Sequence, residues 1–272
     1  MSNRNSQANK AAARERLRAE RERQAKKDKA RRQIVVGVSV VGVLAVVGAA
    51  TWGVMQLNKP SRWEAAADAK NVTAPKNTSG DNGTTVVIGK STAKKTLELY
   101  EDSRCPVCAS FEQAVGETVH KDVDAGKYKI KYIGATFIDN ASNGEGSKKA
   151  LSALGAALDV SPDAFLDYKY ALYSAKYHPE ETDDKFKDDA YLIKVADTVD
   201  ALKGNKAFQE DVKDGTYDNW AMKMSAAFEK SGVQGTPTLK MDGKTLTGTD
   251  GSKNAPMTVA DFNTAITAAL KG

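Results

Sequence analysis

The chain has only two cysteines, and they are separated by two residues in the segment Cys105-Pro106-Val107-Cys108. β-Prone runs at 96–100 and 128–135 flank this segment, and apolar residues recur at every fourth position over 106–121, which predicts a helix between them. The order strand, cysteine pair, helix, strand predicts a βαβ unit with two parallel strands. The cysteines would then lie at the turn from the first strand into the helix.

The region 84–272 is expected to form one α/β domain, because about 190 residues are enough for a core of their own. Three further strands are expected, at 84–88, 238–241 and 245–246. The stretch 145–231 is almost wholly helical in pattern and predicts a helical insertion between the strands. Its helices are expected at 147–158, 162–175, 184–201, around Phe208 and at 219–230. A last helix is expected to begin at Thr258, whose hydroxyl can cap it.

A basic tail, 1–33, precedes an uncharged apolar run, 34–55. The tail holds 12 of the 40 Lys and Arg residues and 4 of the 35 Asp and Glu residues, so its net charge is +8 against −3 for the rest of the chain. The basic character is therefore local and does not indicate a nucleic-acid-binding domain. As a helix the apolar run would be about 33 Å long, which matches the hydrocarbon core of a bilayer. It predicts one transmembrane helix in contact with lipid, with a cleaved signal peptide as the alternative.

The charges beside the apolar run also predict its orientation. Lys and Arg are concentrated before the span, so the tail is expected in the cytoplasm and the residues after the span on the outer side of the membrane. Residues 56–83 are rich in Ala, Thr, Asn, Ser and Lys and have no periodic apolar positions, which predicts a linker. We therefore expect a single-pass protein of the cell membrane whose domain at 84–272 is extracytoplasmic.

The place of the cysteines predicts their chemistry. At the N-cap of a helix, Cys105 would face unpaired backbone N–H groups and the positive end of the helix dipole, which stabilise a thiolate. We expect Cys105 to be the attacking nucleophile and Cys108, one turn further on, to resolve a mixed disulfide. Pro106 would occupy the first helical position, where its missing N–H costs nothing.

Two other interpretations of the cysteine pair exist. A zinc site needs about four ligands, and the chain would have to supply His120 and His178 from separate elements, so we expect no metal. These histidines are expected on the surface. A purely structural disulfide between Cys105 and Cys108 would stabilise little, because so short a loop has little entropy to lose.

Taken together, three features resemble the DsbA-like branch of the thioredoxin superfamily. They are the segment from Leu99 to Glu112, the helical insertion, and the stretch Gly235-Thr236-Pro237-Thr238. The resemblance covers about 84–270. It implies a thioredoxin fold with an inserted helical domain and a redox-active disulfide as the only redox group.

The resemblance also implies how the site is arranged. Pro237 would follow a cis peptide bond and lie against the cysteines, and Thr236 would shape the substrate groove and offer backbone groups to an extended substrate. Pro106 and Val107 would shape the active site from the other side. A Cys105 that is buried, or that lies far from Pro237, would contradict this arrangement.

The sequence departs from the family pattern at two positions. Family members often carry a buried acid six residues before the first cysteine, where this chain has Leu99, and Glu98 would point to the opposite face of the strand. Glu101 and Asp102 lie nearer the cysteines and are expected to be solvated. Val107 stands where the strongest oxidants of the family have a histidine, so the sequence leaves the redox potential open.

By resemblance, the expected function is that of a thiol–disulfide oxidoreductase, most simply an oxidase that gives its disulfide to exported proteins with free thiols. A membrane reoxidase, DsbB-like or VKOR-like, is expected to return the electrons. Two alternatives remain: a reductase or isomerase of the same fold, and a non-catalytic peptide-binding module.

Overall fold

The structure is a computed structural model of the chain, and it divides into the units Met1–Pro60 and Ser61–Gly272. It describes residues 16, 18, 20–24, 26–29, 60–251 and 253–271. The described residues of the first unit are all exposed, and those at 16–29 are helical. The predicted span at 34–55 lies outside the described residues, and none of the helices that are described is long and apolar enough to cross a membrane.

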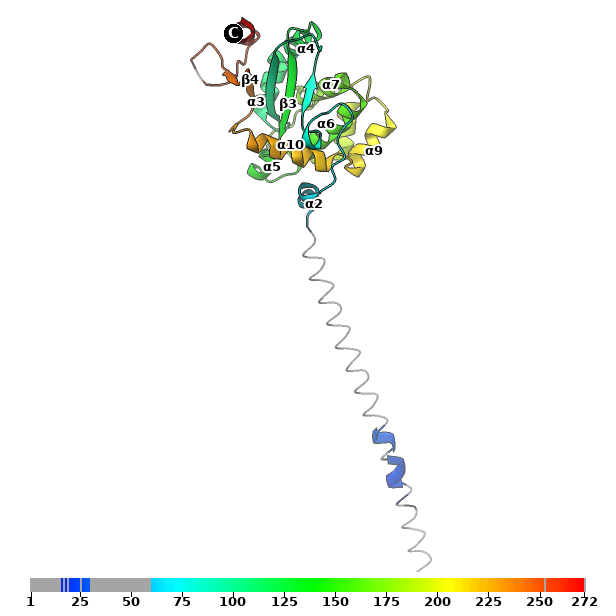
Figure 1. The fold of residues 1–272 in the computed structure, drawn as a ribbon. Helices are drawn as coiled ribbons and strands as arrows, with labels where there is room; N and C mark the ends of the chain where they lie inside the picture. Colours follow the sequence, from blue (N-terminus) through cyan, green and yellow to red (C-terminus); the bar gives the residue numbers. More distant parts are fainter. Residues whose placement is uncertain are drawn as a thin grey trace, which may run out of the picture. The chain divides into compact units, whose positions relative to one another are not determined.

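The second unit is built on a five-stranded sheet in the order β1-β3-β2-β4-β5 (Figure 1). The strands are β1 Val86–Ile88, β2 Thr96–Asp102, β3 Lys129–Ala135, β4 Thr238–Met241 and β5 Lys244–Leu246. β2 and β3 are parallel, and the other neighbours are antiparallel. The predicted βαβ unit is therefore confirmed, and its two strands lie next to each other in the sheet.

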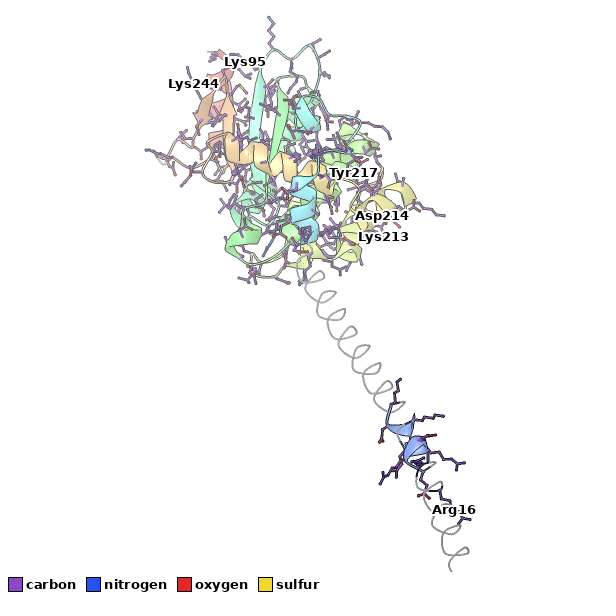
Figure 2. The ribbon with its side chains drawn as sticks, turned by 60° about the horizontal axis from the view of Figure 1, so that its bottom comes forward. Arg16, Lys95, Lys213, Asp214, Tyr217 and Lys244 are labelled. Carbon is purple, nitrogen blue, oxygen red and sulfur yellow. The ribbon has the colours of Figure 1, made fainter. Side chains whose placement is uncertain are left out.

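Helices follow the strands in the predicted order. They are α3 Pro106–Phe111, η2 Glu112–Gly116, α4 Glu117–Asp124, α5 Ile138–Ala141, α6 Gly146–Val160, α7 Pro162–Tyr173, η3 Lys185–Lys187, α8 Asp189–Ala196, α9 Lys206–Asp214, α10 Asp218–Lys230 and α11 Val259–Lys271. α10 packs against β3, as its path across the sheet shows (Figure 1). α11 contacts β5 and η2, a π-helical segment that joins α3 to α4. α9 carries exposed polar residues, among them Lys213 and Asp214 (Figure 2).

The sheet is covered most completely where β2 and β3 end. In both strands the last four residues are buried, whichever way their side chains point. Such two-sided burial is usual for parallel strands between layers of helices. The cysteine turn follows directly after the end of β2, so the site begins in the best-packed part of the domain.

The predicted linker is wrong for the part of 56–83 that the structure describes. Helix α2, Arg62–Asp68, packs against α10, and its Trp63 and Ala66 are buried. The Arg62 guanidinium donates a hydrogen bond of 2.5 Å to the Asp218 carboxylate. Two apolar side chains are too few to produce a periodic pattern, which is why the sequence showed no helix here. A short helical turn, η1 Asp81–Gly83, follows before β1.

Candidate active site

The cysteine turn has the predicted local structure. Cys105 is the N-cap of α3, and its Sγ accepts a hydrogen bond of 3.3 Å from the Cys108 backbone N–H. Pro106 occupies the first turn of the helix, and the Val107 side chain is half exposed. The Cys105 N–H donates to the Asp102 carbonyl, which closes the turn from β2 into α3. Both cysteines are free thiols.

A loop from the other end of the domain meets this turn. The peptide bond between Thr236 and Pro237 is cis, as the resemblance implied. The Thr236 carbonyl oxygen lies 3.4 Å from Cys105 Sγ and accepts a hydrogen bond from it when the thiol is protonated. Folding thus brings together two segments that are 131 residues apart. Antiparallel pairing of β4 with β2 places them, because the loop leads directly into β4.

The pKa values of the two thiols are shifted in opposite directions. The Cys108 side chain contributes most to lowering the pKa of Cys105 to about 6, and the backbone N–H groups of Cys108 and Val107 lower it further, against the opposing effect of burial. Burial raises the pKa of Cys108 well above its ordinary value, and the hydrogen bond to Cys105 raises it further. Near neutral pH the pair therefore holds one thiolate, at Cys105, and one protonated thiol, at Cys108.

The burial of Cys105 departs from our expectation. The residue is 5% exposed, because it packs in a small apolar cluster with Cys108, Ala109, Ile138 and Tyr173. Its burial counts against the predicted arrangement, whereas its contact with Thr236 agrees with it. A groove of about 400 Å³ opens beside the turn. It is lined by Val107, Gly235, Thr236, Pro237, Thr238, Lys253, Asn254, Ala255 and Met257. Cys105 itself does not line the groove, but Thr236, whose carbonyl lies 3.4 Å from Cys105 Sγ, does.

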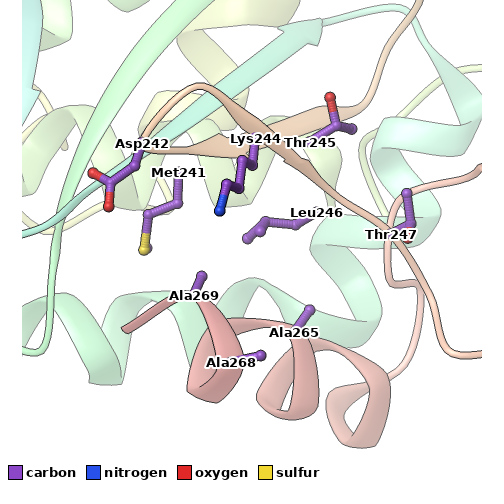
Figure 3. A pocket seen from close by; sticks show the side chains of 9 residues that line it. All are labelled: Met241, Asp242, Lys244, Thr245, Leu246, Thr247, Ala265, Ala268 and Ala269. Atoms are coloured by element: carbon purple, nitrogen blue, oxygen red, sulfur yellow. The ribbon is translucent and has the colours of Figure 1, made fainter. Parts of the chain in front are cut away.

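Another pocket has no lining residue in common with the groove. It has a volume of about 420 Å³ and lies between the β4–β5 hairpin and α11. Figure 3 shows Met241 and Leu246 of the hairpin facing Ala265 and Ala269 of the helix. It contains no cysteine and no part of the cysteine turn, so it is not part of the candidate site.

The two acids before the cysteines are buried, which corrects the expectation that they are solvated. Glu101 and Asp102 have no exposed surface. Asp102 accepts hydrogen bonds from the Arg104 N–H at 3.0 Å, the Ile138 N–H at 3.1 Å and the Ser147 hydroxyl at 2.5 Å. Burial raises the pKa of Asp102 to about 7, although these hydrogen bonds oppose the shift. Asp102 thus joins the cysteine turn to α5 and α6.

Glu101 belongs to a buried cluster of charges. Lys169 of α7 lies 3.1 Å from the Glu101 carboxylate and 2.6 Å from that of Glu112. Burial raises the pKa of Glu101 to about 8, because Glu112 adds to the effect and Lys169 only partly opposes it. The charge of Glu101 also raises the pKa of Cys108. No local pattern predicts this cluster, since Lys169 lies 68 residues after Glu101.

Arg104, the residue before the nucleophile, is buried, and contacts with its guanidinium hold it in place. The Arg104 guanidinium lies 2.9 Å from the Asp139 carboxylate and 3.3 Å from that of Asp184, and it donates to the Glu181 carbonyl at 2.6 Å. Asp184 also accepts from two backbone N–H groups at the start of α6. The helical insertion therefore holds the cysteine turn by ionic contacts as well as by packing.

The two histidines are half-buried, not on the surface as expected. The His178 ring stacks on Tyr173, and its Nε2 lies 3.1 Å from the Ser103 carbonyl. The His120 ring lies 5.6 Å from the ring of Tyr170. Among the residues that the structure describes, no group of three or more His, Cys, Asp or Glu side chains could hold a metal ion.

The acidity of Cys105 can be tested on the reduced protein. We expect the ultraviolet absorbance of the thiolate to appear with a midpoint near pH 6, whereas an ordinary thiol would have its midpoint near 9.0. Because the pKa of Cys105 is lower in the folded state, this thiol contributes stability above pH 9, and the contribution is lost as the pH falls through 6. The absorbance step should be absent in Cys105→Ser. A step near pH 9 in the wild type would contradict the assigned environment.

The known proteins that this chain resembles agree with the geometry of the cysteine turn. The family described as Thioredoxin matches residues 81–268, which include the cysteine turn and Pro237. Disulfide bond formation protein D of Bacillus subtilis is 25% identical over 161 residues, which cover 59% of this chain and 68% of that protein. The reduced disulfide bond oxidoreductase DsbG of Mycobacterium tuberculosis has 27% identity and a TM-score of 0.57 over 69% of this chain and 88% of that structure. Oxidised DsbA of the same organism has 27% identity and a TM-score of 0.56 over 69% and 93%.

Proposed function

Because the chain belongs to the thioredoxin family and is a thiol–disulfide oxidoreductase of the DsbA type, we propose that it introduces disulfide bonds into exported proteins. The observation that carries this proposal is that the pKa of Cys105 is lowered whereas that of Cys108 is raised. A stabilised Cys105 thiolate favours the reduced enzyme, and a disulfide whose reduced form is stabilised is a stronger oxidant.

The reaction has two exchange steps. A substrate thiolate attacks Cys105 Sγ, the disulfide to Cys108 breaks, and the electron pair of that bond goes to the Cys108 sulfur. The second substrate thiol, as its thiolate, then attacks the substrate sulfur of the mixed disulfide. Cys105 leaves as a thiolate, and the substrate has gained a disulfide. The low pKa of Cys105 makes it a good leaving group in this second step.

Cys108 needs a proton when it leaves, because its buried thiolate is unfavourable. In this proposal Glu101 supplies that proton. Burial raises its pKa to about 8, so it is held protonated near neutral pH, and once it has given up this proton its negative charge keeps the pKa of Cys108 high. Glu101 thus takes the place of the acid that is missing at Leu99, two residues further along the same strand and on the same face.

The proposal also states where the protein is located and which proteins it reacts with. The run at 34–55 anchors the protein in the cell membrane, the tail lies in the cytoplasm, and the catalytic domain acts outside it on exported proteins with free thiols. A membrane reoxidase, DsbB-like or VKOR-like, reoxidises the cysteine pair. The reaction uses no cofactor besides this disulfide. The positive-inside charge pattern and the family relationship support these assignments.

Oxidative refolding tests the proposal. The oxidised full-length protein should restore activity to a reduced, disulfide-containing protein, and Cys105→Ser should give only the background rate of air oxidation. The redox equilibrium with glutathione gives the direction of the reaction. A potential near or below that of thioredoxin, about −270 mV, would exclude the oxidase role and favour a reductase.

A further inference from the structure

The groove beside the cysteine turn is lined by apolar and uncharged residues and by one lysine. Of the nine described residues that line it, the apolar ones are Val107, Pro237, Ala255 and Met257. The uncharged ones are Gly235, Thr236, Thr238 and Asn254, and the ninth is Lys253. No Asp or Glu is among these nine, so the charge along the described lining is positive. Because a cleft lined by one sign of charge attracts ligands of the opposite sign, this groove favours an anionic segment.

The groove lies close to the reacting sulfur. The Thr236 carbonyl oxygen, in its wall, is 3.4 Å from Cys105 Sγ, and Val107, two residues after Cys105, is 50% exposed. An extended peptide advances about 3.3 Å per residue, so residues up to three positions from a cysteine bonded to Cys105 lie within about 10 Å of it. The side chains next to a substrate cysteine can therefore reach the groove.

The loop 247–258, between β5 and α11, places Lys253 at this groove. The Gly248 backbone N–H donates a hydrogen bond of 3.0 Å to the Asn254 carbonyl, which closes the loop directly after Lys253. Pro256 is buried and fixes the part of the loop that leads into α11. The position of Lys253 beside the groove is thus set by the backbone on either side of it.

The charge of Lys253 is not compensated by the acids around it. Lys253 is exposed, and it forms no ion pair with the carboxylates that the structure describes. The carboxylate of Asp250 lies towards Gly248, 3.3 Å from the position of a Cβ there, and does not line the groove. The Asp261 carboxylate accepts a hydrogen bond of 2.8 Å from the Thr258 hydroxyl. The Lys253 ammonium group is therefore available to a ligand in the groove.

We propose that Lys253 makes the enzyme prefer substrates with an Asp or Glu side chain within about three residues of the reacting cysteine. This inference rests on the proposed function and narrows its substrates. The carboxylate pairs with the ammonium group at the rim, and the apolar lining takes the uncharged side chains beside it. A charge at the rim of an interface acts mainly on association and on its dependence on salt.

Lys253 acts on binding and not on the thiols. The main contributions to the pKa of Cys105 come from Cys108, burial, Thr236 and the backbone N–H groups of Cys108 and Val107. A substitution at Lys253 removes none of these groups. Its effect is therefore expected in the choice between substrates.

Three dithiol peptides test this preference. Each has the form Cys-Ala-Xaa-Ala-Cys, in which Xaa is Glu, Gln or Lys and lies two residues from either cysteine. The measurement is the second-order rate constant with which each reduced peptide reduces the oxidised full-length protein. We expect the Glu peptide to react about fivefold faster than the Lys peptide, the upper range for an exposed ion pair. In 1 M NaCl the preference should largely disappear, because salt screens exposed charges.

Charge-reversal variants isolate the contribution of Lys253. Lys253→Glu should invert the order of the peptides, and Lys253→Gln should remove the preference. The matched control is Lys213→Glu, which makes the same change in net charge on the exposed side of α9 and should keep the wild-type order. The basic tail is present in all four proteins, and the peptides differ in intrinsic thiol reactivity by the same factor for each protein. Both effects therefore cancel when the Glu-to-Lys rate ratios are compared.

The outcomes separate this preference from the proposed function. A Glu-to-Lys ratio that is the same in Lys253→Glu as in the wild type would overturn the preference and leave the oxidoreductase function intact. An equal loss of rate for all three peptides would also overturn it, because Lys253 would then only support the loop. An equal change of the ratio in Lys213→Glu would assign the preference to net charge. A wild-type protein that neither the peptides nor dithiothreitol can reduce would overturn the proposed function, and the preference with it.

Discussion

Replacing Cys108 by Ala is expected to leave the protein joined to its partners through disulfides on Cys105. Cys108 is the only thiol in the chain that can attack such a mixed disulfide, and its backbone N–H lies 3.3 Å from Cys105 Sγ. Without it, release depends on a second thiol of the partner. Cells expressing the variant, quenched in acid, should show additional high-mass species on non-reducing gels that disappear on reduction, and mass spectrometry of these species identifies the substrates.

The matched control is the double variant Cys105→Ser with Cys108→Ala, which should trap nothing. If the single variant also traps nothing, the cysteines are inert in the cell and the domain is better explained as a peptide-binding module. Partners that are confined to one oxidised membrane protein would point to the reoxidase, whereas a range of exported proteins would identify substrates.

Replacing Lys169 by Met is expected to destabilise the protein by about 3–5 kcal/mol, the usual cost of breaking a buried ion pair from one side. Lys169 is 2% exposed and compensates two carboxyl groups, Glu101 and Glu112, that have no access to water. Urea unfolding of the reduced protein measures the change. Lys213→Met, on the exposed side of α9, is the matched control and should change stability by less than about 0.5 kcal/mol (Figure 2).

The loss of stability in Lys169→Met should depend on pH. The pKa of Glu101 is raised to about 8 in the folded protein, so between its ordinary value of 4.5 and 8 the folded state holds a proton that the unfolded state has released. Stability from this group therefore decreases as the pH rises through that window. Without Lys169 the pKa of Glu101 rises further, so the variant should lose most stability at alkaline pH and least near pH 4. A loss that is independent of pH would show that Lys169 acts by packing alone.

The local features around the cysteines were predictable because neighbouring residues determine them. The strand, turn and helix follow from residues within about 40 positions, and the N-cap of Cys105 follows from Pro106 and the apolar spacing. The cis peptide before Pro237 was implied by a resemblance and not by the residues alone.

The burial of Glu101 and Asp102 was not predictable in this way. Alternation along β2 suggests one exposed face, but distant segments cover both faces at its end. Lys169 and Ser147, which satisfy the two acids, come from the helical insertion. Nothing in the local sequence of β2 shows that a lysine will reach Glu101, so a solvated acid was the simpler expectation. The same applies to α2, in which the buried residues are Trp63 and Ala66.

Arg104 restricts how this protein can change in evolution. Its guanidinium is 1% exposed and depends on Asp139 and on Asp184, which belongs to the helical insertion. A lineage that shortened the insertion would remove Asp184 and the Glu181 carbonyl and leave Asp139 of α5 to compensate the guanidinium. Arg104 would then keep one of its two carboxylates and lose the contacts that join the cysteine turn to the insertion. Shortening the insertion would therefore weaken the support of the residue beside the nucleophile as well as change the surface of the domain.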